Sequence, residues 1–217
     1  MIVAIDGPAG AGKSTVAKII AQRMGFLYID TGSMYRALTL KVLETEINLK
    51  DSARIIELAK ASSIDLVNDP NGDLKVYLDG RDVSSLIRAP RITRVVSDIA
   101  RIREVREVMV KLQRRMGQVR DSVLDGRDIG TVVFPDADKK FFIDANPQER
   151  SKRRYKELLG LGQKVTSEEV SSDLANRDNI DSTRAVGPLK KAEDAVYIDT
   201  SDLSIDQVVD KVLGYLK

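Results

Sequence analysis

The sequence predicts an α/β protein in which a parallel sheet of about five strands lies between two layers of helices. Two observations support this fold class. Short apolar segments that end in an acidic residue recur along the chain, and apolar residues repeat at helical spacing between them. Strands that alternate with helices form parallel sheets, because a parallel crossover needs enough chain to contain a helix. The chain has 217 residues, which suits one domain over residues 1–217.

The first part of the chain contains two strand–helix pairs. Residues 2–6 form the first predicted strand, and a helix is predicted after Lys13, where the apolar positions over residues 16–24 share one face. Gly25 is suited to end that helix, because glycine readily adopts the left-handed conformation of a C-terminal cap. Residues 26–29 predict a second strand, and the apolar spacing over residues 34–42 predicts another helix.

Residues 64–88 depart from this alternation. Three short strand-like pieces lie here, and turn signals separate them at residues 69–72 and 79–80. Closely spaced strands joined by tight turns pair in antiparallel fashion. We therefore predict a small antiparallel insert within the α/β domain.

The remainder of the chain returns to alternating elements. A long charged helix is predicted with its apolar stripe over residues 105–116. Residues 146–149 have the layout of a helix start, with a capping residue, a proline at the first position and an acid at the third. The last helix is expected to begin near Ser204. Three further strands are predicted over residues 122–125, 140–144 and 195–199.

The composition excludes several kinds of chemistry. The chain contains no Cys and no His, which removes disulfides, thiolate nucleophiles, Cys-based zinc sites and imidazole bases. A net charge of +2 argues against general nucleic-acid binding. No apolar run approaches the roughly 20 residues of a membrane span, and the first acid comes too early for a signal peptide. We expect a cytoplasmic protein that works with carboxylates, hydroxyls, Lys, Arg and backbone amides.

Residues 7–14, Gly-Pro-Ala-Gly-Ala-Gly-Lys-Ser, match the phosphate-loop pattern G-x-x-x-x-G-K-[ST] between a predicted strand and a predicted helix. The glycines let backbone N–H groups turn toward phosphates, and the helix N-terminus adds partial positive charge. Lys13 is expected to reach the β- and γ-phosphates, and Ser14 to bind Mg²⁺. The predicted ATP-binding residues here are Gly7, Pro8, Ala9, Gly10, Ala11, Gly12, Lys13, Ser14 and Thr15.

The class of phosphate-loop protein follows from what accompanies the loop. A GTPase usually carries Asn-Lys-x-Asp, and this chain contains no Asn-Lys pair. Motors and helicases are normally larger, so a small-molecule kinase fits the length best. Arginines gather with acidic or hydroxyl neighbours at residues 30–36, 125–128, 150–154 and 177–184. Because arginine forks bind phosphate oxygens and keep their charge when buried, these clusters predict a site for two anionic substrates.

The chain resembles the bacterial cytidylate kinases, nucleoside-monophosphate kinases of the P-loop superfamily, over essentially its whole length. The most specific segment runs over residues 125–135, Asp-Gly-Arg-Asp-Ile-Gly-Thr-Val-Val-Phe-Pro. The resemblance implies a three-layer P-loop kinase fold, with residues 64–88 as a monophosphate-binding β insert and residues 150–166 as a helical lid. The other segments that carry it are residues 5–8, 30–32, 35–36 and 184–189.

The resemblance also implies an acceptor site for CMP. The implied set is Thr31, Arg36, Arg127 and Arg184 at the phosphate, Arg177 and Asp181 at the sugar, and Ser97, Arg106 and Asp128 at the base. Asp128 suits cytosine, because a carboxylate accepts from the exocyclic amine where uracil presents a carbonyl. Members of the family often have Ser where this chain has Thr31, and either hydroxyl can donate to phosphate. Without the resemblance, Ser97 and Arg106 would be interpreted as exposed helix residues.

Three arginines, Arg150, Arg153 and Arg154, share one helical face at spacings of three and four. By itself this pattern is also typical of a basic helix end at the surface. The resemblance implies a lid that closes over ATP, with Arg150 and Arg153 at the ATP and Gly160 and Gly162 permitting hinge motion. The implied catalytic set is Lys13, Arg127, Arg154 and Arg184.

The predicted reaction is transfer of the ATP γ-phosphoryl group to CMP or dCMP, assisted by Mg²⁺, in a monomer that binds only small molecules. Asp125, at a strand end, would either hold Mg²⁺ through water or form a salt bridge with an arginine. Two other functions remain open at this point. One is a small-molecule kinase of different preference, for example for UMP, and the other is an ATP-binding module without turnover.

Overall fold

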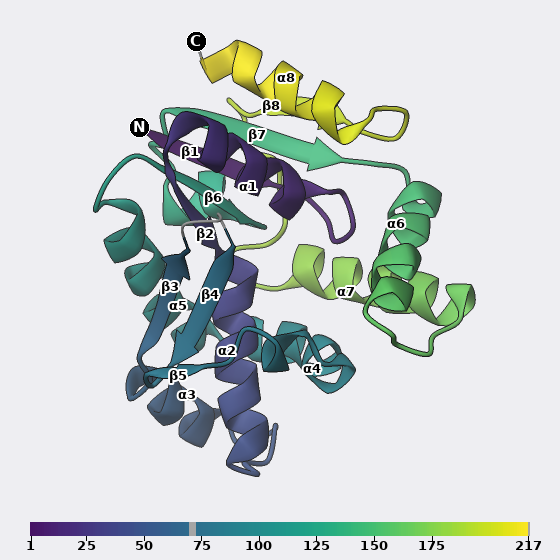
Figure 1. Cartoon of the computed structure of the whole chain (residues 1–217). Helices are drawn as coiled ribbons and strands as arrows, with labels where there is room; N and C mark the ends of the chain where they lie inside the picture. Colours follow the sequence, from purple (N-terminus) through teal and green to yellow (C-terminus); the bar gives the residue numbers. More distant parts are fainter. Residues whose placement is uncertain (70–72, 217) are drawn as a thin grey trace.

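Five parallel strands form the central sheet of the computed structural model, which describes residues 1–69 and 73–216 (Figure 1). The strands are β1 (Ile2–Asp6), β2 (Leu27–Asp30), β6 (Ser122–Gly126), β7 (Lys139–Asp144) and β8 (Val196–Asp199). Their order across the sheet is β2-β6-β1-β7-β8, and every neighbouring pair is parallel. The predicted α/β fold with a parallel sheet is confirmed.

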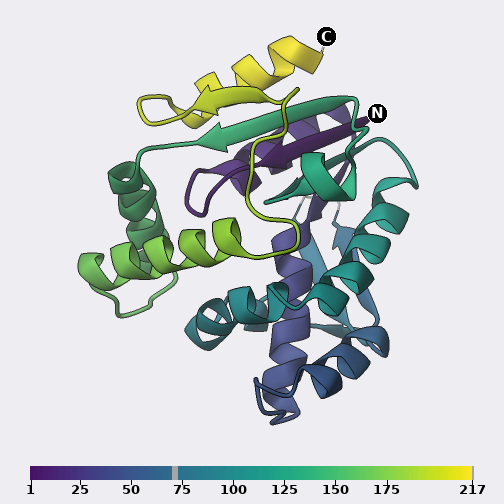
Figure 2. The same cartoon turned by 180° about the vertical axis from the view of Figure 1, so that it is seen from behind.

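Helices cover both faces of this sheet. On one face, α1 (Lys13–Met24) and α8 (Ile205–Leu216) enclose an apolar core that includes Val3 of β1. On the other, α2 (Thr31–Glu44) and α5 (Arg103–Gly117) contribute to a second core (Figure 2). Successive side chains of a strand point to opposite faces, so the neighbours of Val3 along β1 alternate between the two cores. The result is the predicted three-layer arrangement.

The insert is an antiparallel sheet in the order β3-β4-β5, as predicted. Its strands are β3 (Ile64–Asn68), β4 (Leu74–Leu78) and β5 (Arg81–Asp82). The turn between β4 and β5 places Asp79 and Gly80 at φ of 50° and 81°, the left-handed conformations that a tight two-residue hairpin requires. Residues 70–72 of the other predicted turn lie outside the described residues.

The insert is attached to the central sheet at its β2 edge. Asn68 donates from its side-chain amide to the carbonyl oxygen of Tyr28 at 3.0 Å. The small helix α3 (Ser52–Lys60) precedes the insert, and α4 (Pro90–Ala100) follows it after a short 3₁₀ turn over Leu86–Arg88. The hydrogen bond covers part of an otherwise unpaired strand edge.

The helix prediction for the middle of the chain is only partly confirmed. The predicted stripe over residues 105–116 lies in α5, but α4 comes before it as a separate helix, because the chain extends at Ile102. The sequence also did not predict α3 or α7 (Ser167–Thr183). Most of α7 is exposed, so its apolar period is weak, although Thr166 and Glu169 form a capping box at its start.

The helices α6 (Pro147–Gly160) and α7 lie side by side beyond the end of β7, in green in both views (Figures 1 and 2). Leu158, Val170 and Leu174 form a small core with Ala9 of the phosphate loop. This contact places the helix pair against the loop. No helix within the described residues is long and apolar enough to cross a membrane.

The start of α6 supplies a test of the fold. Asn146 caps this helix by accepting from the backbone N–H of Glu149 at 2.8 Å. We expect Asn146→Ala to lower the free energy of unfolding by about 1 kcal/mol, because that N–H loses its partner. In a chain of this size the thermal midpoint should fall by about 2–4 °C.

Asn179→Ala is the matched control, because Asn179 is exposed in the interior of α7. Alanine is the better helix former there, so its midpoint should not fall. Equal thermal midpoints for Asn146→Ala and the wild-type protein would show that the Asn146 cap contributes nothing to stability.

Candidate active site

The phosphate loop spans residues 7–12 between β1 and α1, at the carboxyl edge of the sheet. Gly7 has φ of 147°, and a Cβ atom there would lie 1.9 Å from the carbonyl oxygen of Ile143. No larger residue fits, because that oxygen belongs to the backbone of β7. The close packing fixes where the loop leaves the sheet and aims the N-terminus of α1 into the space above it.

Lys13 is the first residue of α1, and its side chain is buried under the loop. It is 5% exposed, and its Nζ donates to the carbonyl oxygen of Pro8 at 2.6 Å. Burial, followed by the charge of Arg127, lowers the pKa of Lys13 to about 7. A phosphate bound in the loop would favour the charged form. The geometry therefore suits a cation that becomes fully charged when an anion arrives.

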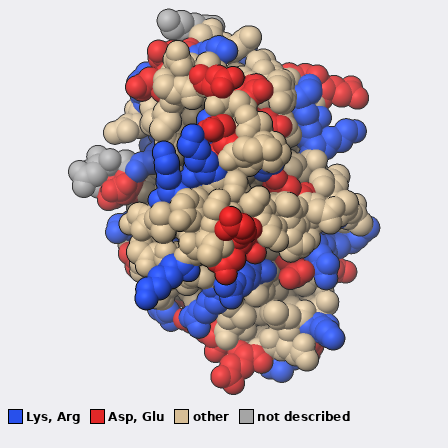
Figure 3. All heavy atoms as spheres, turned by 90° about the vertical axis from the view of Figure 1, so that its right-hand side faces the viewer, with Lys and Arg blue, Asp and Glu red and all other residues tan. Residues whose placement is uncertain are grey.

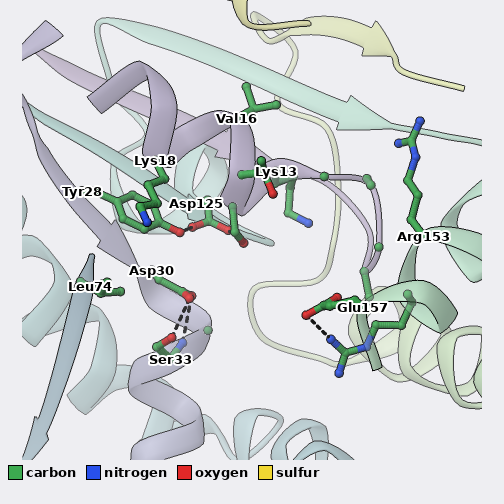
Figure 4. Close-up of a pocket in the computed structure, with 18 of the residues that line it drawn as sticks. Lys13, Val16, Lys18, Tyr28, Asp30, Ser33, Leu74, Asp125, Arg153 and Glu157 are labelled. Atoms are coloured by element: carbon green, nitrogen blue, oxygen red, sulfur yellow. Dashed lines mark hydrogen bonds and ion pairs between the residues drawn. The ribbon is translucent and has the colours of Figure 1, made fainter. Parts of the chain in front are cut away.

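Asp125, in β6, accepts a hydrogen bond from a hydroxyl group on each of its carboxylate oxygens, and Figure 4 shows Tyr28 beside it. Ser14 donates to Oδ2 at 2.7 Å, and Tyr28 donates to Oδ1 at 2.8 Å. Burial, followed by the charge of Asp30, raises the pKa of Asp125 to about 7. Within the described parts of the chain Asp125 forms no ion pair with an arginine, so the salt-bridge alternative is wrong.

A cavity of about 1360 Å³ opens beside the loop. It is lined by residues 9–15, by the ends of β2 and β6, and by side chains from the insert and from α6 and α7. The predicted arginines that line it are Arg36, Arg127, Arg153, Arg154 and Arg177. On the face that α6 and α7 form, basic and acidic side chains are interspersed (Figure 3). The arginines of the cavity are therefore not the extension of a single-sign patch on that face.

Two of these arginines are poorly compensated within the protein. Arg36 donates to the hydroxyl of Thr93 at 2.9 Å and to the carbonyl oxygen of Ile87 at 3.3 Å, and burial lowers its pKa to about 10. Burial, followed by the charges of Arg127 and Arg36, lowers the pKa of Arg177 to about 9. The buried Nε of Arg177 has no hydrogen-bond partner among the described residues. An anion in the cavity would relieve both deficits.

The structure separates the three arginines of α6. Arg153 lines the cavity and donates to Oγ1 and to the carbonyl oxygen of Thr200, at 2.9 and 2.6 Å. Arg154 also lines it and pairs with Glu157 at 2.7 Å. Arg150 does not line the cavity. Its guanidinium pairs with Asp178 and donates to the carbonyl oxygens of Ala9 and Ala145, and so holds the outside of the loop.

Behind the cavity, a chain of buried ion pairs connects Arg127 to Asp128. Arg127 Nε lies 2.9 Å from Asp181 Oδ2, and Arg184 lies 3.5 Å from both Asp181 and Asp128. Arg106 pairs with the second oxygen of Asp128. Burial alone would raise the pKa of Asp181, but the neighbouring arginines lower it below its usual value. Acids and arginines thus alternate, which lets this many charges share a buried site.

Ser97 and Arg106 are both buried, so their interpretation as exposed helix residues is wrong. Arg106 is 1% exposed and lies over the ring of Tyr35, 5.5 Å from its centre. Ser97 is 7% exposed and lines a smaller cavity of about 260 Å³ together with Arg154 and Arg177. Sequence spacing could not reveal this burial, because the partners come from segments distant in the chain.

Thr31 is buried and donates to the backbone carbonyl of Asp125 at 2.7 Å, and it does not line the main cavity. Sequence reasoning missed Asp30 and Tyr28. Asp30 lines the cavity and caps α2 by accepting from the backbone N–H of Ser33 at 2.9 Å. The pattern of acid-ended strands could have found Asp30. Nothing in the sequence marks Tyr28, because its partner Asp125 lies 97 residues away.

Comparison with known proteins adds to this geometry. A model of the cytidylate kinase family matches residues 3–217. The chain is 52% identical over 210 residues to the cytidylate kinase of Caldanaerobacter subterraneus subsp. tengcongensis, covering 97% of this chain and 92% of that protein. It is 50% identical over 215 residues to that of Alkaliphilus oremlandii, covering 99% and 97%.

Among solved structures, an uncharacterized protein from Eubacterium ventriosum aligns with a TM-score of 0.53 at 14% identity, over 100% of this chain and 97% of that one. At this identity the likeness concerns the fold alone.

The low pKa of Lys13 leads to a test of the phosphate loop. At pH 8 most Lys13 side chains should be neutral, because the pKa of Lys13 is about 7. Binding of ATP without Mg²⁺ should raise that pKa, so that each binding event takes up most of one proton. Calorimetric titrations in buffers of different ionisation enthalpy measure this uptake.

Two variants identify the group that takes up the proton. Lys13→Met should abolish the proton uptake, because the titrating amine is removed. Asp125→Asn should retain it, because this variant removes the nearby Asp125 carboxylate and keeps the Lys13 amine. If Asp125→Asn abolished the uptake and Lys13→Met retained it, the assignment to Lys13 would be refuted.

Proposed function

The chain belongs to the cytidylate kinase family, and from this premise we propose that it transfers the γ-phosphoryl group of ATP to CMP or dCMP, giving ADP and CDP or dCDP. One observation carries the proposal. The family match extends through both the phosphate loop and the Arg127–Asp128 segment, and these lie at the same edge of one sheet. A donor site and an acceptor site that adjoin in this way suit direct transfer between two phosphates.

The donor phosphates would lie in the loop over residues 7–14. Backbone N–H groups of the loop and the N-terminus of α1 would face the phosphate oxygens, and Lys13 would neutralise charge on the β- and γ-phosphates. Arg153 and Arg154 line the same cavity, which supports a role for both as ATP and transition-state contacts. Arg150 would act indirectly, through the backbone of Ala9.

The acceptor needs no general base. A monophosphate already presents an oxyanion at neutral pH, which agrees with a chain that contains no His. The task of the protein is to bring two anionic groups together and to stabilise the transferring phosphoryl group. Arg36, Arg127 and Arg177 line the cavity, and the charges of Arg36 and Arg177 are only partly compensated by the protein, which supports the assignment of these arginines to the acceptor. Arg184 and Thr31 would act from behind them.

Asp128 is the residue that we assign to recognition of cytosine. A carboxylate accepts from the exocyclic amine of cytosine and repels the carbonyl oxygen that uracil presents there. Arg106 forms an ion pair with Asp128, and Ser97 lies at the smaller cavity beside Arg177. Asp181, paired with Arg127, has the charge and position to accept from sugar hydroxyls. The arrangement supports a preference for CMP and dCMP over UMP.

Residues in the cavity also fit Mg²⁺. The Ser14 hydroxyl and the Asp125 carboxylate are the hard oxygen donors that this ion prefers. The residues that the structure describes form no group of three or more acidic, His or Cys side chains that could hold a metal. This agrees with an ion that is bound by one or two protein oxygens, water and the ATP phosphates. Ser14 would bind it directly and Asp125 through water, and the ion would supply charge neutralisation between the phosphates.

We also propose that residues 64–88 bind the monophosphate and that residues 150–166 form a lid. Residues of both segments line the cavity, with Leu74 on one side and Glu157 on the other (Figure 4), so an approach of the two segments would exclude water from the transferring group. A monomer suffices for this arrangement, because one chain supplies every residue assigned here. The cytoplasm is the compartment that we propose, since ATP and nucleoside monophosphates are available there.

An ADP-release assay with ATP and Mg²⁺ tests the proposed function directly. The acceptors to compare are CMP, dCMP, UMP, AMP, GMP and none. We expect strong turnover on CMP and dCMP, weak turnover on UMP and none on the purines. Equal turnover on all acceptors would refute recognition of cytosine, and turnover that ignores the acceptor would refute the kinase assignment.

Asp128→Asn tests whether Asp128 recognises the cytosine base. The amide keeps the shape but can donate to the uracil carbonyl, so the preference for CMP over UMP should fall by about 10- to 100-fold. The kcat/KM for each acceptor is the quantity to measure, and a thermal melt checks that the protein stays folded. Asp136→Asn, a change at an exposed position just after the 125–135 segment, is the control and should leave the ratio unchanged.

A further inference from the structure

Asp6, the last residue of β1, is a buried carboxylate for which the proposed reaction has no direct use. It is 4% exposed. Its Oδ1 accepts from the backbone N–H of Ile129 at 2.8 Å, and its Oδ2 accepts from the backbone N–H of Gly130 at 2.7 Å. A carboxylate whose two oxygens each hold a successive amide of one distant segment fixes that segment in position and in orientation.

The segment that Asp6 holds is the one that carries the acceptor-binding residues. Ile129 and Gly130 come directly after Arg127 and Asp128 and begin a π-helical turn, Ile129–Val133. The first amides of a helical turn have no partner within it, and here the carboxylate supplies one from a neighbouring strand. π-Helical turns are rare and occur often at functional sites.

The other end of this turn is held as well. Arg114, from α5, donates through Nε to the carbonyl oxygen of Val133 and through a terminal nitrogen to that of Val132, both at 2.7 Å. A negative group thus lies at the amino end of the turn and a positive group at its carboxyl end, in agreement with the local backbone dipole. Asp6 is the one of the two that lies next to Arg127 and Asp128.

Asp6 also adjoins the donor site, because Gly7 of the phosphate loop is the next residue. The β1–β6 register sets Asp6 opposite Gly126, one residue before Arg127. A displacement of the 127–130 backbone would therefore change the distance between the donor loop and the acceptor-binding side chains. One carboxylate therefore lies where it contacts the 127–130 backbone segment and directly precedes the phosphate loop.

We propose that Asp6 is a positioning residue for acceptor recognition: it holds the backbone of residues 127–130 so that Arg127 and Asp128 face the acceptor. This inference rests on the proposed function. Ionisation is essential to the role, because both bonds come from N–H donors and need two acceptor oxygens. Asn in this place would turn an NH₂ group against one of the two amides.

Asp6→Asn is the first test. We expect the KM for CMP to rise by about tenfold or more and the ratio of kcat/KM for CMP to that for UMP to fall, because one of two buried amides loses its acceptor. The Kd for ATP, measured by titration, should change much less. Unchanged KM and ratio, or an equal loss for both acceptors that merely follows the loss of thermal stability, would overturn the proposal.

Asp138→Asn is the matched control. Asp138 accepts from the backbone N–H of Ile2 at 2.6 Å, so it makes the same kind of bond at the opposite end of the same strand. It is exposed and lies away from the cavity. If Asp138→Asn altered the CMP-to-UMP ratio as much as Asp6→Asn does, the effect would belong to β1 as a whole, and the assignment to Asp6 would fail.

Asp6→Glu covers the case in which Asp6→Asn does not fold. It keeps the charge but adds one methylene group, so it should displace the 127–130 segment and lower the CMP-to-UMP ratio while the Kd for ATP is retained. A ratio equal to that of the unchanged enzyme, in a folded Asp6→Glu protein, would overturn the proposal.

A double-mutant cycle with Asp128→Asn tests whether Asp6 acts through Asp128. In the Asp128→Asn background, Asp6→Asn should change the CMP-to-UMP ratio little, because the carboxylate that recognises cytosine is already removed. An undiminished further fall would contradict the proposal. The wild-type enzyme tests the proposed function separately from the variants. If the wild-type enzyme showed no preference for CMP over UMP, the proposed function would be refuted, and this inference with it.

Discussion

The structure depends on holding several cations together at a buried site before any phosphate binds. Lys13, Arg36 and Arg177 lie around one cavity, and burial together with the charges of neighbouring arginines lowers the pKa of each. In a water-poor site such repulsion is weakly screened, so the scaffold must prevent these side chains from moving apart. The alternating ion pairs around Asp128 and Asp181 provide part of that restraint. The remaining imbalance is what favours anionic substrates.

The parallel sheet makes this concentration possible. Strands that run in one direction bring their carboxyl ends to one edge, where β1 leads into the phosphate loop and β6 leads into Arg127 and Asp128. Asp30 ends β2 opposite Asp125. The insert and the α6–α7 pair adjoin this edge, and residues from both line the cavity. Asp6, beside the phosphate loop, holds the backbone of Ile129 and Gly130, which follow Asp128.

Much of the fold could be predicted from short-range patterns. The acid-ended strands, the end of α1 before Gly25 and the start of α6 at Asn146 all rest on interactions within a few residues. The break between α4 and α5 and the existence of α7 could not, because an exposed helix has little apolar period and a break at Ile102 has no breaker residue. The described part of the insert was predicted because its turns have residues that favour left-handed conformations.

For the candidate site, the sequence by itself determined the phosphate loop and the set of arginine-containing segments. Binding of phosphate requires the residue types of the loop in that order and requires cationic side chains. It could not determine which of three neighbouring arginines on α6 line the cavity and which one supports the loop, nor that Arg106 is buried against Asp128. Those outcomes were decided only by tertiary structure. Hydrogen bonds and ion pairs between segments tens of residues apart depend on how the sheet and helices pack. A local sequence pattern does not specify which distant segments come into contact.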